Sequence, residues 1–368
     1  MDSLFQFSLH AIVFIAGLLV VIGTLYSAIE TFVVPRSTND PLTRFVFQSI
    51  FSVFALLTRN ARTYHERDRA MAFYAPIALL ALQPTWIVLV MIGYTLMFWG
   101  IGYGSWDKSL EVSGSSVLTL GFVAVDDVPE YLLAFSEAAL GLLLVALLIA
   151  YLPTIYGAFQ RREMMVNLLE VRAGSPPTAW EMLARYHRIH SLNNLNEQWR
   201  MWEQWFADVE ESHTSIAAVI FFRSQQPDRS WITAAGAILD AAALARSALD
   251  IERDAQADLC LRAGYIALRR ICDFFDIPYN ANPKPEDAIS IARTEFDQVC
   301  NDLQAQGVPL KSDREQAWRD YVGWRVNYDV PLLALCALTM APYAPWSSDR
   351  SPRARNVVRR ALKMKGEK

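Results

Sequence analysis

Three long stretches without a charged residue constrain this chain more than any other feature of its sequence. They cover residues 11–29, 70–106 and 138–160. A helix needs about 20 consecutive apolar residues to cross the hydrocarbon core of a bilayer, and each stretch reaches roughly that length or exceeds it. Only helices and closed barrels can satisfy all their backbone polar groups inside lipid. The sequence therefore predicts an all-α membrane protein with three transmembrane helices.

The positions of the arginines predict how these helices are oriented. Two arginines close the last stretch, and the segment between the first two stretches is rich in arginine, at Arg36, Arg44, Arg59, Arg62, Arg67 and Arg69. Because such an excess in a short loop marks the cytoplasmic side, we expect the N-terminus outside and the C-terminal half in the cytoplasm. Within the loop, residues 45–58 are predicted to form an amphipathic helix, either at the inner membrane interface or packed on the cytoplasmic domain.

Residues 112–125 form a fourth uncharged stretch, which is too short to cross a bilayer. A run of roughly 10–14 residues is typical of a re-entrant or interfacial segment. Non-helical backbone is tolerated at membrane depth only where it is buried in protein or lines a water-filled path. The turn of Thr119, Leu120, Gly121 and Phe122, followed by two carboxylates, therefore predicts a re-entrant pore loop.

The two carboxylates, Asp126 and Asp127, are predicted to lie at the outer mouth of that loop. In an oligomer they would form rings, and rings of carboxylates concentrate cations at the entrance of a pore. The alternative is a solvated turn before the last span, in which either aspartate caps the helix that begins near Pro129.

The same residues carry a resemblance to a known family. Thr119-Leu120-Gly121-Phe122, with Asp126 and then Pro129, resembles the T-V-G-Y-G-D-x-x-P signature of potassium-channel filters. Residues 159–163 and 172–178, F-Q-R-R-E and R-A-G-S-P-P-T, are similar more narrowly to bacterial two-helix pore-loop channels that have a long helical cytoplasmic domain. The resemblance covers residues 70–180 and says little about the first 69.

The resemblance implies a homotetramer in the bacterial inner membrane, with K⁺ as the permeant ion. The backbone carbonyls of Thr119, Leu120, Gly121 and Phe122 would replace part of the hydration shell of that ion. The sequence departs from the family where Val123-Ala124-Val125 stands in place of the second filter glycine. Glycine adopts positive φ freely and a valine does not, so the filter is degenerate and the selected ion is left open.

Three residues of the last span are candidates for functional roles. Glu137, near the start of that span, matches the family's inner-helix carboxylate. Gly141 and Pro153 could each bend the helix and so form a gate or hinge, since proline removes a backbone donor and glycine relaxes the chain. Packing notches are the alternative reading for Gly141 and Pro153.

Beyond the last span the sequence reads as helix. The turn residues Gly174 to Pro177 precede Thr178 and Glu181, which match a capping box. We expect helices near 178–213, 214–224, 229–249, 252–276, 285–305 and 313–342. The sequence predicts five parts. Residues 1–69 form an N-terminal span with its cytoplasmic loop, residues 70–162 a pore domain, residues 163–177 a linker and residues 178–349 a helical cytoplasmic domain. Residues 350–368 form a basic tail that attracts anionic lipid or is simply solvated.

The cytoplasmic half carries none of the motifs that predict an enzyme. There is no P-loop, GxGxxG, GxSxG or HExxH sequence, and the four cysteines have no metal-site spacing. His187 and His190 could bind a metal ion but lack a third ligand. Residues 210–213 include a hydrolase-like set of side chains, but these are adjacent in sequence and are expected not to face each other. The net charge of −4 gives no general bias towards nucleic acid.

These observations predict a cation channel without enzymatic activity or bound cofactor, whose partners are membrane lipids and further copies of the chain. The inner helix would gate the pore, and the cytoplasmic domain would couple an unidentified ligand or partner to that gate. The alternative is a non-conducting, membrane-tethered sensor or scaffold whose helical domain binds a partner; the Val123-Ala124-Val125 insertion favours it.

Overall fold

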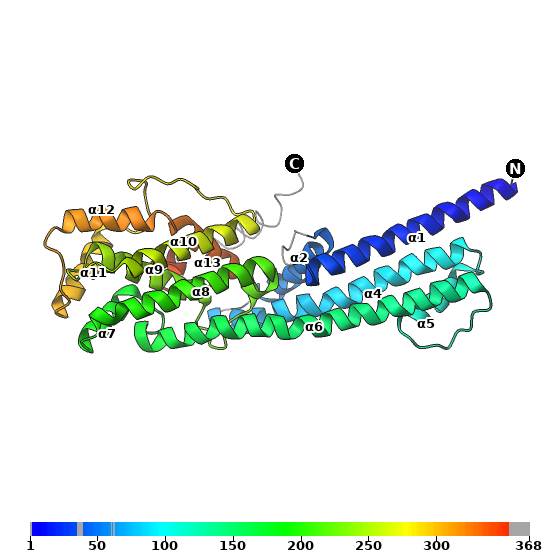
Figure 1. Ribbon diagram of the computed structural model, residues 1–368, viewed down its shortest axis with the longest axis horizontal. Coiled ribbons are helices and arrows are strands. Elements are labelled where there is room, and N and C mark those ends of the chain that lie inside the picture. Colours follow the sequence, from blue (N-terminus) through cyan, green and yellow to red (C-terminus); the bar gives the residue numbers. More distant parts are fainter. Residues whose placement is uncertain (1, 35–39, 60, 62, 353–368) are drawn as a thin grey trace. The chain divides into compact units, whose positions relative to one another are not determined.

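The computed structural model describes residues 2–34, 40–59, 61 and 63–352, and these residues form a helical protein (Figure 1). No β-strand occurs among them; a single isolated bridge joins Leu249 to Leu310. Three segments, Phe5–Phe32, Tyr64–Gly100 and Val128–Ala173, are long and apolar enough to cross a membrane. The predicted all-α class is thus confirmed, and the three segments that could cross a membrane overlap the three stretches predicted to do so. Most of the basic tail, residues 353–368, lies outside the described residues.

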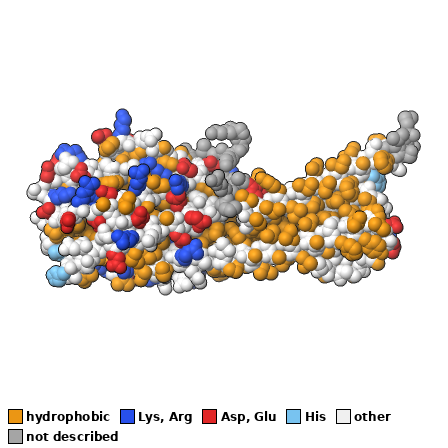
Figure 2. All heavy atoms as spheres, viewed as in Figure 1, with side chains coloured by type: hydrophobic (Ala, Val, Ile, Leu, Met, Phe, Trp, Pro, Cys, Tyr) orange, Lys and Arg blue, Asp and Glu red, His pale blue; other side chains and the backbone are white. Residues whose placement is uncertain are grey.

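The chain divides into two compact units. Residues 1–59 and 73–156 make up the first, and residues 60–72 and 157–368 the second. Hydrophobic side chains dominate the visible face of the helices of the first unit, whereas Lys, Arg, Asp and Glu side chains gather on those of the second (Figure 2). In the first unit large side chains such as Ile12 and Leu142 are more than half exposed. Such exposure would be unfavourable in water and is expected in lipid.

The first unit contains α1 (Asp2–Phe32), α2 (Pro41–Leu57), α4 (Tyr74–Gly100), α5 (Trp106–Val117) and the first part of α6 (Val128–Ala173). α1 and α4 pack closely because both have glycine at the contact. A Cβ atom on Gly93 would lie 2.6 Å from Cγ2 of Val21 and 2.9 Å from the carbonyl oxygen of Gly17. Small residues allow the two backbones to come this close. Such close packing drives helix association in membranes, because apolar side chains contact lipid as favourably as they contact another helix.

A buried hydrogen-bond chain joins α1, α2 and α4. The indole Nε1 of Trp86 donates to Oγ of Ser27 at 3.1 Å, and that hydroxyl donates to Oδ2 of Asp40 at 2.6 Å. Asp40 is the N-cap of α2, because the same oxygen accepts from the amide of Thr43. The predicted amphipathic segment 45–58 therefore forms most of α2, which is anchored within the first unit at its N-terminus.

The second unit is built around α9 (Trp231–Ser247), whose residues are all buried except Arg246, which is only partly covered. Alanine and glycine fill much of this helix, so its neighbours can approach it on every side. The other helices of the unit are α3 (Tyr64–Met71), the end of α6, α7 (Ala179–Arg188), α8 (Leu195–Ser215), α10 (Ala255–Phe274), α11 (Arg293–Ala305), α12 (Arg314–Arg325) and α13 (Asp329–Thr339). Short 3₁₀ turns occur at Leu192–Asn194 (η1), Ala217–Phe221 (η2) and Ser348–Arg350 (η3).

Several helix boundaries differ from those predicted. The expected helix 178–213 is two helices, because His190 adopts a left-handed φ of 55° after α7. The expected helix 313–342 is interrupted between α12 and α13. The expected helix 285–305 begins only at α11, where the Glu295 side chain accepts the amide of Ala292, and residues 285–292 are irregular. Residues 214–224 hold the end of α8 and only a 3₁₀ turn. The prediction of Thr178 as the N-cap of α7 is confirmed, since its hydroxyl accepts the amide of Glu181.

A buried ion-pair network holds α9, α12 and α13 together. The guanidinium of Arg325 is completely buried and donates to both carboxylate oxygens of Asp240, at 2.7 and 2.8 Å, and to Asp329 at 2.7 Å. Its last nitrogen donates to the carbonyl of Trp346, and the Tyr328 hydroxyl donates to Asp240. A buried charge is tolerated only with such complete pairing, so this network specifies how the three helices meet.

We expect Gly93→Ala to destabilise the protein by about 1–3 kcal/mol, because the new methyl group would overlap α1 and force the two helices apart. Thermal unfolding of the full chain in detergent, followed by circular dichroism, measures the effect. Gly23→Ala is the matched control, since a Cβ there has no atom within 4 Å. An equal response of both variants would contradict the inferred contact between α1 and α4.

Candidate functional site

The candidate site consists of α5 and the loop 118–127 that joins it to α6. α5 has 12 residues, so it is about 18 Å long and too short to cross a membrane. It lies between the two long helices α4 and α6 in the chain, and its buried residues include Ser109, Val112, Ser113 and Ser115. A short helix followed by an irregular segment thus lies between two helices of membrane-spanning length, and the re-entrant pore loop stays a prediction.

One serine organises the first half of the loop. The backbone amides of Leu120 and Gly121 donate to the carbonyl oxygen of Ser115, at 2.8 and 3.4 Å. The amides of Phe122 and Val123 donate to the hydroxyl oxygen of the same serine, at 3.1 and 3.4 Å. Four consecutive amides therefore point back at a single residue of α5. This convergence requires left-handed backbone, which occurs at Thr119 (φ 54°) and Gly121 (φ 68°).

The direction of the carbonyls follows from these amides. In a trans peptide the N–H of one residue and the C=O of the preceding residue point in opposite directions, and the peptides of this loop are trans. The carbonyls of Thr119, Leu120, Gly121 and Phe122 therefore all point away from Ser115. These are the four residues predicted from the sequence to form a filter, and all four are exposed in the single chain.

The second half of the loop is held differently. Val123, Ala124 and Val125 are not among the residues with positive φ, as expected for β-branched side chains. The hydroxyl of Tyr103 donates to the carbonyl of Ala124 at 3.3 Å, so that this carbonyl points towards the turn after α4. The row of carbonyls that point away from Ser115 thus stops at Phe122, where the sequence departs from the potassium-channel signature.

Asp126 and Asp127 lie at the end of the loop with exposed side chains. Their backbone amides donate to Oε2 of Glu130, at 3.0 and 3.4 Å, while the carbonyl of Asp127 accepts the amide of Tyr131. Glu130, which we had not singled out, therefore caps the start of α6. Its position three residues after Asp127 is the capping-box spacing that could have identified it. Both aspartate carboxylates are left available at the surface of the single chain.

Glu137 is buried behind α5. Its Oε1 lies 2.5 Å from the hydroxyl of Ser113, which is also 2.9 Å from the carbonyl of Met91 on α4. Its other oxygen, Oε2, is buried without a hydrogen-bond partner among the described residues, as is the hydroxyl of Ser109 one turn earlier on α5. The inner-helix carboxylate of the sequence prediction is thus placed against α5, away from the exposed carbonyls of the loop.

Gly141 is a point of close approach between α6 and α5. A Cβ there would lie 2.2 Å from the carbonyl oxygen of Val117, the last residue of α5. Pro153, by contrast, is exposed, and α6 is one uninterrupted helix through both residues. Gly141 therefore positions the end of α5 beneath the loop, as the packing alternative stated, and a hinge at either residue stays a prediction.

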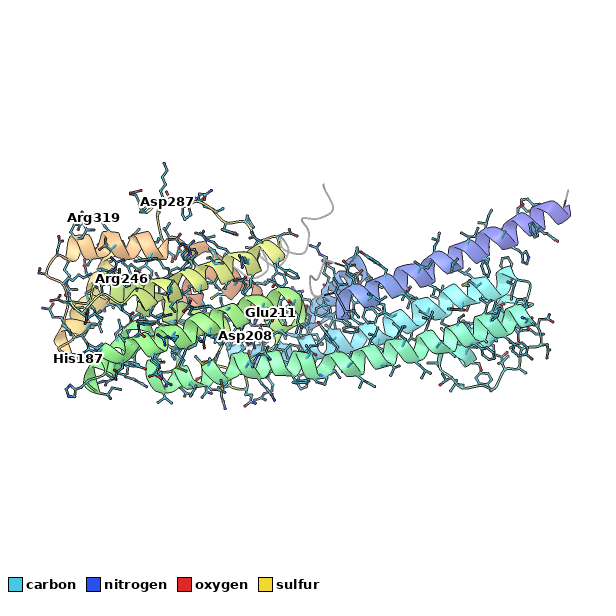
Figure 3. The ribbon with its side chains drawn as sticks, in the orientation of Figure 1. His187, Asp208, Glu211, Arg246, Asp287 and Arg319 are labelled. Carbon is cyan, nitrogen blue, oxygen red and sulfur yellow. The ribbon has the colours of Figure 1, made fainter. Side chains whose placement is uncertain are left out.

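In the second unit, the last part of α6 is tied to α8 and η2 through a buried arginine. The Arg162 guanidinium is fully buried; it pairs with Glu163 and donates to the carbonyls of Val219 and Phe222, at 2.8 and 2.7 Å. The backbone carbonyl of Arg162 accepts the indole N–H of Trp205. Arg161 beside it pairs with Asp208 of α8 at 2.9 Å, one of the residues labelled in Figure 3. The expected linker 163–177 is accordingly helical to Ala173, and α6 enters the core of the second unit.

The structure places the two sets of side chains in the second unit that the sequence analysis weighed as catalytic or metal-binding. Ser212 and His213 do contact each other, with Oγ 3.1 Å from Nδ1, so the expectation that neighbouring residues would not meet was wrong. Both are buried, and His213 packs against Trp231, with the two rings tilted by 55°, and lies beside Arg162. His187 and His190 belong to no group of potential metal ligands in the described part of the chain.

Comparisons with known proteins add no family to this description. No family model, no curated protein and no solved structure matches the chain. The function therefore has to be argued from the geometry of its own residues.

We expect Gly141→Ala to loosen the loop, because the new methyl group would collide with the carbonyl of Val117 and displace the end of α5 that carries Ser115. Amide hydrogen exchange of residues 118–127, measured by mass spectrometry, should become severalfold faster. Gly157→Ala, on the same helix, meets only the end of the flexible Arg161 side chain and serves as the control. Unchanged exchange in Gly141→Ala would show that α6 does not position α5.

The buried His213 should make stability depend on pH. Burial, and then the charge of Arg162, hold the pKa of His213 well below its usual range, so the folded protein keeps this histidine neutral. The unfolded chain takes up a proton near pH 6.5, and the free energy of unfolding therefore falls as the pH drops below that value, by up to about 1.4 kcal/mol per pH unit. We expect His213→Gln to show a shallower fall between pH 7 and 5 in thermal unfolding; an unchanged slope would contradict the assignment.

Proposed function

We propose that the protein is one subunit of a cation channel, in which α5 and residues 118–127 form a re-entrant pore loop. The observation that carries the proposal is that the carbonyls of residues 119–122 all point away from Ser115, on which the four following amides converge. Rings of backbone carbonyls are how ion filters replace the hydration shell of a cation. One loop supplies one such row, so conduction requires several chains around a common axis, and we propose a tetramer.

The exposure of the loop supports an assembly. The side chains of Leu118, Leu120 and Phe122 are 51%, 60% and 62% exposed in the single chain. Exposure of these apolar side chains to water is unfavourable, so we do not expect them to line an aqueous path. Neighbouring chains would cover them, leaving the carbonyls towards the axis. The exposed carboxylates of Asp126 and Asp127 would then form rings at the outer mouth.

The connection through α6 supports control by the second unit. α6 runs without interruption from the candidate pore region to Arg162 and on to Ala173. Arg162 donates hydrogen bonds to carbonyls in and just after η2 and accepts one from Trp205 of α8. A displacement of those elements would therefore be transmitted to α6. We propose that the arginine-rich 36–69 loop and the second unit face the cytoplasm of a bacterial cell, with the loop 118–127 outside.

A second function is favoured by one observation. The carbonyl row ends at Phe122, because Val123 to Val125 are not in left-handed conformations and Ala124 turns its carbonyl towards Tyr103. The backbone after Phe122 thus lacks the second glycine of the potassium-channel signature, and selectivity for K⁺ over Na⁺ is left open. The alternative is a membrane-tethered sensor or scaffold that does not conduct.

Ion flux into liposomes that contain the full-length protein tests the proposal, measured first in K⁺ and then in Na⁺. We expect a K⁺ flux that Ser115→Ala lowers at least about tenfold, because the amides of Phe122 and Val123 lose their acceptor and the carbonyl row loses its direction. Ser116→Ala is the matched control, since the Ser116 side chain makes none of the hydrogen bonds that hold the loop in the described structure. Gly121→Ala should reduce flux as well, because Gly121 has a positive φ.

The possible outcomes separate the two functions. Equal flux of both ions that still depends on Ser115 would keep the channel and reject K⁺ selectivity. Flux that is insensitive to Ser115→Ala would place the pore elsewhere. A folded, oligomeric protein that passes neither ion at any voltage would reject the channel and leave the sensor or scaffold.

A further inference from the structure

We infer that the second unit contains a binding site for a small organic anion, one with an apolar ring or chain and a single carboxylate or phosphate group. The site is a cavity of about 570 Å³. We also propose that binding of the anion changes the ion flux. That effect rests on the channel function proposed above, whereas the binding itself does not. Cavities of roughly 300–1,000 Å³ are of the size that holds small ligands in proteins.

The cavity lies where α8 begins, α9 ends and α10 begins. Lys311 closes it from the segment before α12. Its lining divides equally into apolar and polar side chains, the apolar ones being Leu192, Leu195, Trp199, Ala245, Leu249, Ile251 and Ala257, and the polar ones Asn193, Asn196, Arg246, Glu252, Arg253, Asp254 and Lys311.

The apolar residues form a rigid floor. Leu195, Trp199 and Leu249 are nearly completely buried in the helices that surround the cavity. The apolar surface that remains open to a ring or a short hydrocarbon chain is that of Leu192 and Ile251, which line the cavity and are partly exposed. Ligand sites are commonly built in this way, with an apolar surface for affinity and a few polar groups for orientation.

The polar residues offer more free donors than free acceptors. Lys311 uses two N–H groups to cap the end of α9, at the carbonyls of Arg246 (2.8 Å) and Ser247 (3.1 Å), and keeps one. Arg246 pairs with Asp258 through Nε, which leaves its two terminal nitrogens without a partner among the described residues. Oδ1 of Asp254 accepts from both the amide of Gln256 and the side chain of Asn196.

This imbalance identifies the charge of the ligand. An anionic group placed between Arg246 and Lys311 would accept the unused N–H groups of both, whereas Arg253 at the rim already pairs with Asp258 at 3.2 Å. Charge-assisted hydrogen bonds of this kind are the strong ones, and arginine suits carboxylate and phosphate geometry. Glu252, the second lining carboxylate besides Asp254, lies exposed at the rim and disfavours an anion there.

Two helices lead from the cavity to the buried arginine of α6. α8 lines the cavity with Leu195 and Trp199 near its start, and further along it contacts α6 through Trp205 and His213. α9 lines the cavity at its C-terminal end and packs Trp231 against His213 at its start, with ring centroids 4.6 Å apart. A ligand that draws α8 and α9 together would thus act on the elements that hold Arg162. Such a coupling is established only by showing that both sites respond to one binding event.

Equilibrium dialysis of the full-length protein in lipid nanodiscs tests the site with named probes. Indole-3-acetate and AMP each carry an aromatic body and an anionic group, tryptamine has a similar body with a positive charge, and inorganic phosphate has no body. We expect at least one of the two organic anions to bind once per chain, without competition from tryptamine and with only weak competition from phosphate.

Three variants of the cavity and one control locate the binding. Arg246→Gln and Lys311→Met should each weaken it about tenfold. Asn193→Asp, on the exposed rim, adds a negative charge without removing an internal contact and should also weaken it. Arg319→Gln is the control, because Arg319 is an exposed arginine of α12 that does not line the cavity; Figure 3 labels it together with Arg246.

The proposal is overturned if neither organic anion binds at about 5 mM, or if the three cavity variants bind as Arg319→Gln does. Flux measured with and without the bound anion tests the regulatory effect. Binding without any flux would keep the site and reject the channel, whereas flux without binding would keep the channel and reject the site. Flux that the anion leaves unchanged in the unsubstituted protein would keep both and reject the coupling.

Discussion

The candidate site depends on one residue, Ser115, which accepts four consecutive backbone amides as the chain leaves α5. A segment that is not helical has to satisfy its peptide groups locally wherever water is scarce, and a carbonyl and hydroxyl on the same residue do so for residues 120–123. Once the amides are fixed, planarity of the peptide fixes the carbonyls on the opposite side. The position of Ser115 in turn depends on Gly141, where α6 comes so close to the end of α5 that no side chain fits.

The second unit solves a comparable problem with charges. Arg162 and Arg325 are both fully buried, and every nitrogen of each guanidinium is directed at a carboxylate or a carbonyl. Burying such a charge is unfavourable unless its pairing is complete, so each arginine specifies its neighbours. Arg325 orients α12 and α13 against α9, and Arg162 orients the end of α6 against η2 and α8. The end of α6 therefore lies within the core of the second unit.

The success and failure of sequence reasoning follow the range of the interactions involved. The three apolar segments, the N-cap at Thr178 and the break at Gly174 were predictable because each depends on neighbours within a few residues. The split of 178–213 at His190 was missed, since the apolar stripe continues in register across the turn. Ser115 and Glu130 were missed for another reason: a serine before a turn and a glutamate after one are common, and only their partners give them a role.

We could predict from the sequence alone that the chain is helical, where three helices are long and apolar enough to cross a membrane, and that one uncharged stretch between them is too short to do so. Length and hydropathy are properties of a segment and can be read without knowing its neighbours. The three-dimensional structure was needed to show that the carbonyls of 119–122 all point away from Ser115, that Glu137 is buried against Ser113, and that a cavity opens beside Arg246 and Lys311. Each of these brings together residues that are separated in the chain, and the sequence carries no measure of such distances.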